Sequence, residues 1–143
     1  ELIVEMLRLL DMGQAPRVPQ VNDFASLARK ITKKDESIDW GWTRKRVVDH
    51  VRALSPAPGA RLQLFGNEIK VCKARSVDAS EAAGLRLPDL NPGTALALDD
   101  CSVYVAAADG WVELESVRPA GGRTMECRAF SRGRRLSGNT RVE

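Results

Sequence analysis

The sequence is poor in the residue types on which most enzyme and metal sites depend. Its 143 residues contain one histidine, His50, and three cysteines, with no CxxC pair. A zinc centre needs clustered His and Cys ligands and a disulfide framework needs paired cysteines, so the sequence predicts neither. The wide separation of Cys72, Cys101 and Cys127 indicates a reducing, cytoplasmic compartment. No apolar run approaches the ~20 residues of a membrane span, so no membrane partner is expected.

Catalytic motifs are missing as well. A single histidine inside a predicted helix cannot form a Ser/His/Asp or Cys/His set, and Gly121-Gly122 lacks the GxxxxGK pattern of a phosphate loop. The chain also starts at Glu1, with no Met and no signal peptide, which indicates a fragment of a longer protein. The chain alone therefore predicts no catalysis.

Aromatic residues make up only 5% of the chain, which disfavours a base-stacking surface, and the net charge is only +3. The charge is nevertheless strongly uneven. Residues 29–52 carry eight cations and four acids, residues 78–115 carry eight acids and one arginine, and residues 123–141 carry six arginines and one acid. If the fold brings the two basic segments together, they form a face suited to a phosphate backbone rather than to base reading.

The first 39 residues divide into a helix and a connector. Residues 1–12 carry an apolar stripe that covers nearly the whole helix surface, and Gly13 is a suitable stop. We interpret this helix as the last one of a domain that is otherwise absent; the alternative is that it packs on the following domain. Pro16 and Pro19 break any period in the basic connector that follows, over residues 14–39.

The remaining sequence predicts a β-rich domain over residues 40–143. A helix is expected at 43–54 with Thr43 as its N-cap, and another at 124–132 with Gly133 as its stop. Strands are expected at residues 60–65, 68–77, 94–98, 101–107 and 111–117, with residues 78–92 as a loop. The alternation slips near Lys73, as at a bulge, and Asp109-Gly110 is a type I′ turn signal. The predicted class is mainly β with flanking helices: a five-stranded OB-like Greek-key barrel plus an N-terminal helix and linker.

Four stretches stand in a specific order and spacing. They are Gln20 with ASLARKITK at 25–33, IDW at 38–40, VRALSPAPGA at 51–60 and VRPAGGRTMECRAFSRGRRL at 117–136. This pattern resembles the methionyl-tRNA formyltransferase family, whose segments read Q…ATYAPKITK, IDW, IRAFNPWPGA and LQPEGKKRMSAxEFLRGxRL.

The resemblance implies that the chain is the C-terminal part of such an enzyme: the last catalytic-domain helix at 1–13, a basic linker at 14–39 and a barrel domain at 40–143. The family transfers a formyl group from 10-formyltetrahydrofolate to the amino group of methionyl-initiator tRNA in translation initiation. Its catalytic Asn/His/Asp set matches nothing here. We therefore expect no catalytic residue, cofactor or metal in this chain.

The resemblance also implies that the basic linker and barrel hold initiator tRNA through its backbone, with the protein as a monomer. Lys30 falls on the linker lysine of the family's APK motif. The expected tRNA contacts are Lys30, Lys33, Lys34, Arg44, Lys45, Arg46, Arg52, Arg134 and Arg135. For Lys45 and Arg52 the alternative is helix pairing with Asp49.

Two other functions remain open at this point. The chain is also consistent with the C-terminal domain of another 10-formyltetrahydrofolate-dependent formyltransferase, which acts on a sugar nucleotide or an amino acid. The other alternative is a non-enzymatic OB-fold module that binds single strands or a protein, against which the low aromatic content argues.

Overall fold

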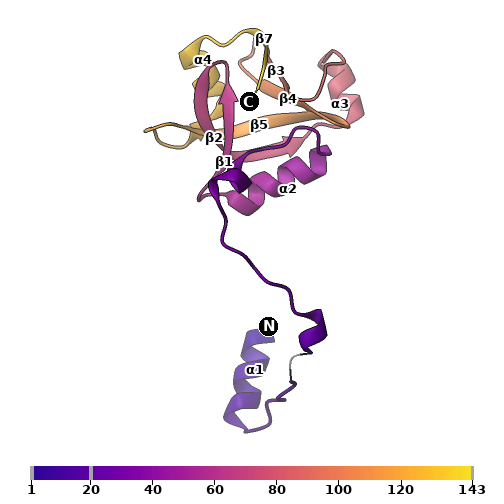
Figure 1. Ribbon diagram of the computed structural model, residues 1–143, viewed down its shortest axis with the longest axis vertical. Helices are drawn as coiled ribbons and strands as arrows, with labels where there is room; N and C mark the ends of the chain where they lie inside the picture. The colour runs from indigo at the N-terminus through magenta and orange to yellow at the C-terminus, as the bar shows by residue number, and fades with distance from the viewer. Residues whose placement is uncertain (1, 20, 143) are drawn as a thin grey trace. The chain divides into compact units, whose positions relative to one another are not determined.

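The computed structural model describes residues 2–19 and 21–142 of the chain. The predicted positions Glu1, Gln20 and Glu143 lie outside the described residues. The chain divides into two compact units, Glu1–Lys30 and Ile31–Glu143 (Figure 1). The second unit therefore begins inside the segment 14–39 that was expected to be a linker.

The first unit contains the predicted helix. α1 spans Leu2–Asp11, and Gly13 follows it with a φ of +67°. A short 3-10 turn, η1, spans Asn22–Phe24. α1 buries none of its described side chains, although most of them are apolar.

The second unit is built on one curled antiparallel sheet. Its strands are β1 (Ala60–Leu64), β2 (Asn67–Ser76), β3 (Thr94–Ala97), β4 (Val103–Ala107), β5 (Gly110–Pro119), β6 (Met125–Glu126) and β7 (Gly138–Arg141). They are ordered β1-β2-β5-β4-β3-β7, with β6 paired to β5. The mainly β prediction and its five strands are confirmed. The sequence analysis missed β6 and β7, because these short, largely exposed strands lack an alternating apolar pattern.

Four helical segments accompany this sheet in the described part of the second unit. They are η2 (Lys33–Glu36), α2 (Arg44–Leu54), α3 (Ala79–Gly84) and α4 (Cys127–Arg134). Thr43 caps α2 as predicted, since its side chain accepts a hydrogen bond from the Arg46 N–H. The predicted loop contains α3, which Asp78 caps by accepting from the Glu81 N–H at 2.7 Å. α4 continues past Gly133 and ends at Arg135, whose φ is +53°.

The turns and irregularities of the sheet match the sequence in part. The predicted bulge is confirmed, since the register between β2 and β5 shifts on both sides of Lys73. Phe65 and Gly66 join β1 to β2 with φ values of +47° and +72°, which is the type I′ pattern. The predicted type I′ turn at Asp109-Gly110 is wrong, because only Gly110 has a positive φ there, at +138°.

The larger of two hydrophobic clusters is the main core, and it joins the sheet to two helices. Val47 and Val51 enter it from α2, and Cys127 and Phe130 enter it from α4. α2 packs against β1, β2 and β5, whereas α4 packs against β4, β5 and β6. Figure 1 shows α2 below the sheet and α4 above it, so the two helices cover different parts of the sheet.

Candidate nucleic-acid interface

The turn η2 presents two lysines to solvent. The Asp35 carboxylate accepts hydrogen bonds from the Thr32 N–H at 2.8 Å and the Thr32 hydroxyl at 2.7 Å, closing a capping box around the turn. Lys33 and Lys34 are exposed, and no ion pair joins either to another described residue. Lys30, also exposed, is the last residue of the first unit. The Lys33–Lys34 pair is therefore available to an anion.

Two expected contacts on α2 share one carboxylate. Asp49 accepts from the Lys45 ammonium at 2.6 Å and from the Arg52 guanidinium at 2.9 Å. The Lys45 hydrogen bond is the main reason why the pKa of Asp49 lies below its ordinary value. The helix-pairing alternative is thus correct for both cations. Their side chains remain 85% and 79% exposed, so an incoming phosphate can still reach them.

Arg44 and Arg46 have different environments although they share the first turn of α2. The Arg44 guanidinium donates to the Val77 carbonyl, its Nε lies 3.4 Å from an Asp109 carboxylate oxygen, and its side chain is 26% exposed. Arg44 therefore joins parts of the fold. Arg46 is exposed, with its Cζ atom 4.3 Å from the centroid of the Trp42 ring. That stacking holds a guanidinium at the surface.

The last two expected contacts lie at the end of α4. Arg134 and Arg135 are exposed and form no ion pair with residues 2–19 or 21–142; the Arg134 Cζ lies 6.0 Å from the Phe130 ring centroid. Because α2 and α4 cover different parts of the sheet, these arginines do not join the cations of η2 and α2 (Figure 1). The basic residues thus form two separate regions rather than one face.

His50 packs against Trp42, which precedes α2. Its ring centroid lies 5.2 Å from that of Trp42 in an edge arrangement, and its Nε2 is buried without a hydrogen-bond partner. Burial, with the nearby Arg46 charge, lowers the pKa of His50, so it is neutral at pH 7. No group of His, Cys, Asp and Glu among the described residues could hold a metal ion.

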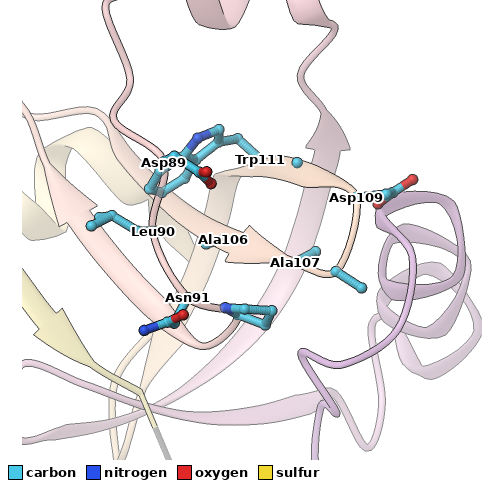
Figure 2. Close-up of a pocket in the computed structure, with 10 residues that line it drawn as sticks. Asp89, Leu90, Asn91, Ala106, Ala107, Asp109 and Trp111 are labelled. Carbon is cyan, nitrogen blue, oxygen red and sulfur yellow. The ribbon is translucent and has the colours of Figure 1, made fainter.

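A cavity of about 520 Å³ lies between the loop at residues 89–92 and the β4–β5 hairpin (Figure 2). Asp89 and Asp109 line it along with Trp111. These two carboxylates disfavour a phosphate ligand. The cavity is therefore lined by acidic side chains, unlike the basic regions described above.

One charged network was missed by the sequence analysis. Arg75 on β2 stands directly opposite Glu113 on β5 and forms an ion pair with it. Arg128 lies 3.7 Å from the same buried carboxylate, and Arg75 also pairs with Glu81. The pairing depends on the β2–β5 register, so no local sequence signal could have shown it.

Helices that could cross a membrane, being both long and apolar, do not occur within the described residues.

Residues 30–135 match the family described as "Formyl transferase, C-terminal domain". The methionyl-tRNA formyltransferase of Heliobacterium modesticaldum is 36% identical over 140 residues, and that of Syntrophus aciditrophicus is 33% identical over 140 residues. These alignments cover 94% and 98% of this chain but 43% of each relative, so the chain spans less than half of their length.

Solved structures show the same fold. A variant of HypX from Aquifex aeolicus superposes with a TM-score of 0.67 at 21% identity, covering 92% of this chain and 22% of that one. The structure of HypX in complex with tetrahydrofolic acid gives a TM-score of 0.65 at 21% identity, covering 90% and 22%.

Proposed function

The chain belongs to the formyl transferase C-terminal domain family, and on this premise we propose that it is the tRNA-binding C-terminal part of a methionyl-tRNA formyltransferase. The whole enzyme transfers a formyl group from 10-formyltetrahydrofolate to the amino group of methionyl-initiator tRNA in the cytoplasm. Two curated relatives with that name, which align over nearly all of this chain, support the proposal.

The domain organisation follows the same proposal. α1 is the last helix of the catalytic domain at residues 1–13, followed by the basic linker at 14–39 and the barrel domain at 40–143. The support is that α1 is mostly apolar yet buries none of its described side chains within its own unit. In the barrel domain, the path β1-β2-β5-β4-β3 forms the five-stranded body of an OB-like Greek-key barrel.

The observation that carries the tRNA role is the pair Lys33 and Lys34, exposed on a capped turn with no acidic partner among the described residues. An ammonium in this setting binds a phosphate oxygen without first breaking an ion pair. On α2, Arg46, Lys45 and Arg52 add exposed cations, the last two sharing Asp49, and Lys30 of the first unit is a further proposed contact.

The second basic region, Arg134 and Arg135 on α4, contacts the tRNA at another part of its backbone. Arg44 contributes by fixing the start of α2 rather than by contact. Such contacts position a polyanion and carry no base specificity. The domain thus holds the tRNA body as a monomer while the upstream catalytic domain performs the chemistry.

The experiment is a titration of the chain with initiator tRNA at increasing salt. Each phosphate neutralised contributes a slope of about −0.9 in log K against log salt on a duplex, so four to six contacts predict a loss of about a hundredfold to a thousandfold between 50 and 200 mM. Undetectable binding at low salt, or affinity that stays flat with salt, would remove the proposal.

A further inference from the structure

The lysine-bearing turn is fastened to the sheet immediately after it ends. The Glu36 carboxylate lies 3.3 Å from the Lys70 ammonium on β2, and the Lys70 ammonium also donates to the Pro58 carbonyl at 2.6 Å. The two side chains are only 13% and 32% exposed. This ion pair therefore joins the linker to both β2 and the segment before β1 in a partly dehydrated setting.

Two further contacts hold the same place. Ser37 forms a parallel bridge with Arg61 of β1, so the linker continues the edge of the sheet for one step. The neighbouring Ile38 packs on the main core. From Glu36 onward the connector is part of the folded domain.

We propose that Glu36 and Lys70 are positioning residues that hold the η2 turn against the barrel and so keep Lys33 and Lys34 in the arrangement that tRNA phosphates bind. This inference rests on the proposed tRNA-binding function. A loose linker spends only part of its time in the competent arrangement, and the apparent affinity falls by that fraction. The Glu36–Lys70 ion pair keeps the turn in the competent arrangement before the tRNA binds, so this loss of affinity is avoided.

The charge of Glu36 makes this inference separable from simple electrostatics. Glu36 lies two residues from Lys34, so replacing it with glutamine removes a negative charge beside the proposed site. Charge alone predicts tighter tRNA binding for Glu36→Gln. The positioning role of the Glu36–Lys70 ion pair predicts weaker tRNA binding, by about three- to tenfold, because the turn is released and competent conformers become a minority.

The test compares the unaltered chain with three variants by tRNA titration and by hydrogen exchange over residues 31–37. Glu36→Gln should bind more weakly, with a shallower salt slope and faster exchange in that segment. Glu115→Gln is the matched control, because it makes the same charge change and breaks an ion pair of 3.2 Å between Glu115 on β5 and Lys73 on β2, the strand that carries Lys70. It should leave exchange at 31–37 unchanged.

A charge-swapped variant, Glu36→Lys with Lys70→Glu, restores the pair and should recover most of the affinity and protection. The inference is overturned if Glu36→Gln binds as tightly as the unaltered chain or more tightly. It is equally overturned if the swapped variant recovers neither quantity while its melting temperature stays near that of the unaltered chain. If the unaltered chain does not bind tRNA, the proposed function fails instead.

Discussion

The carboxylate of Asp109, at the tip of the β4–β5 hairpin, accepts a hydrogen bond of 2.6 Å from the backbone N–H of Arg44 in the first turn of α2. The same carboxylate lies 3.4 Å from the Arg44 side chain. The first turn of α2 carries three cations, which interact unfavourably with the positive end of the helix dipole. α2 has no acidic residue of its own in that turn. A residue 65 positions away supplies that acid.

Replacing Asp109 with alanine should therefore destabilise the domain. The loss of a capping acceptor and of one charge beside Arg44 costs about 1–2 kcal/mol of the free energy of unfolding. Urea denaturation measures it. Asp99→Ala, in the neighbouring hairpin, is the control and should stay within about 0.5 kcal/mol of the unaltered chain. Equal effects for the two variants would refute the capping role.

The double change Lys33→Glu with Lys34→Glu should weaken tRNA binding strongly and leave the melting temperature within a few degrees. Both side chains are exposed on η2, and neither forms an ion pair with a described residue, so their removal costs little packing. Filter binding at fixed salt measures the affinity. Arg134→Glu with Arg135→Glu makes the same charge change on α4 and reports whether the second basic region contributes. Unchanged affinity for the lysine variant would exclude these lysines from the interface.

The thiol of Cys127 should be inert in the folded protein. Cys127 is 1% exposed in the core, and its burial raises the pKa of the thiol to about 12, so the thiolate is scarce at pH 8. Alkylation followed by peptide mass spectrometry should modify Cys72 and Cys101 first, since both are partly exposed. All three should react in denaturant. Rapid labelling of Cys127 without denaturant would contradict the packing of α4.

Stability should fall between pH 7 and pH 5 because of His50. The pKa of His50 is below its ordinary 6.5, chiefly through burial and then through Arg46, while Asp35 and the backbone of Glu36 and Ser37 partly oppose the shift. The unfolded chain therefore binds more protons in this range, and the free energy of unfolding decreases as the pH drops below 6.5.

His50→Phe should flatten this dependence, since His50 is the one histidine of the sequence and the carboxylates titrate mainly at lower pH. Urea midpoints at pH 7 and pH 5 measure it for both proteins. The same slope in the variant and the unaltered chain would show that other groups cause the effect.

The local features of the chain were readable in advance. The i, i+4 apolar spacing and Thr43 identified α2, and the period-two pattern and its slip at Lys73 identified β2 and its bulge. Family motifs in the linker and the C-terminal segment identified the domain, and residues 30–135 match that family. Each of these signals lies within one short stretch of chain.

The partners of the charged residues were not readable in advance. Arg44 and Arg46 look alike in sequence, yet one is fastened to Asp109 and Val77 while the other lies exposed against Trp42. Arg128 belongs to a basic segment in the sequence but lies beside Glu113 in the fold. The charge count along the chain therefore predicted one basic face, whereas the structure has two separate basic regions.

The sequence by itself determined α1, α2, most of α4, the five main strands and the family, because periodicity, capping residues and short motifs act over a few neighbouring positions. Only the tertiary structure decided which cations remain available, and that the two basic segments lie on different parts of the sheet. The physical reason is that charge pairing follows distance in space. Strand register and helix placement set those distances between residues that are far apart in the chain.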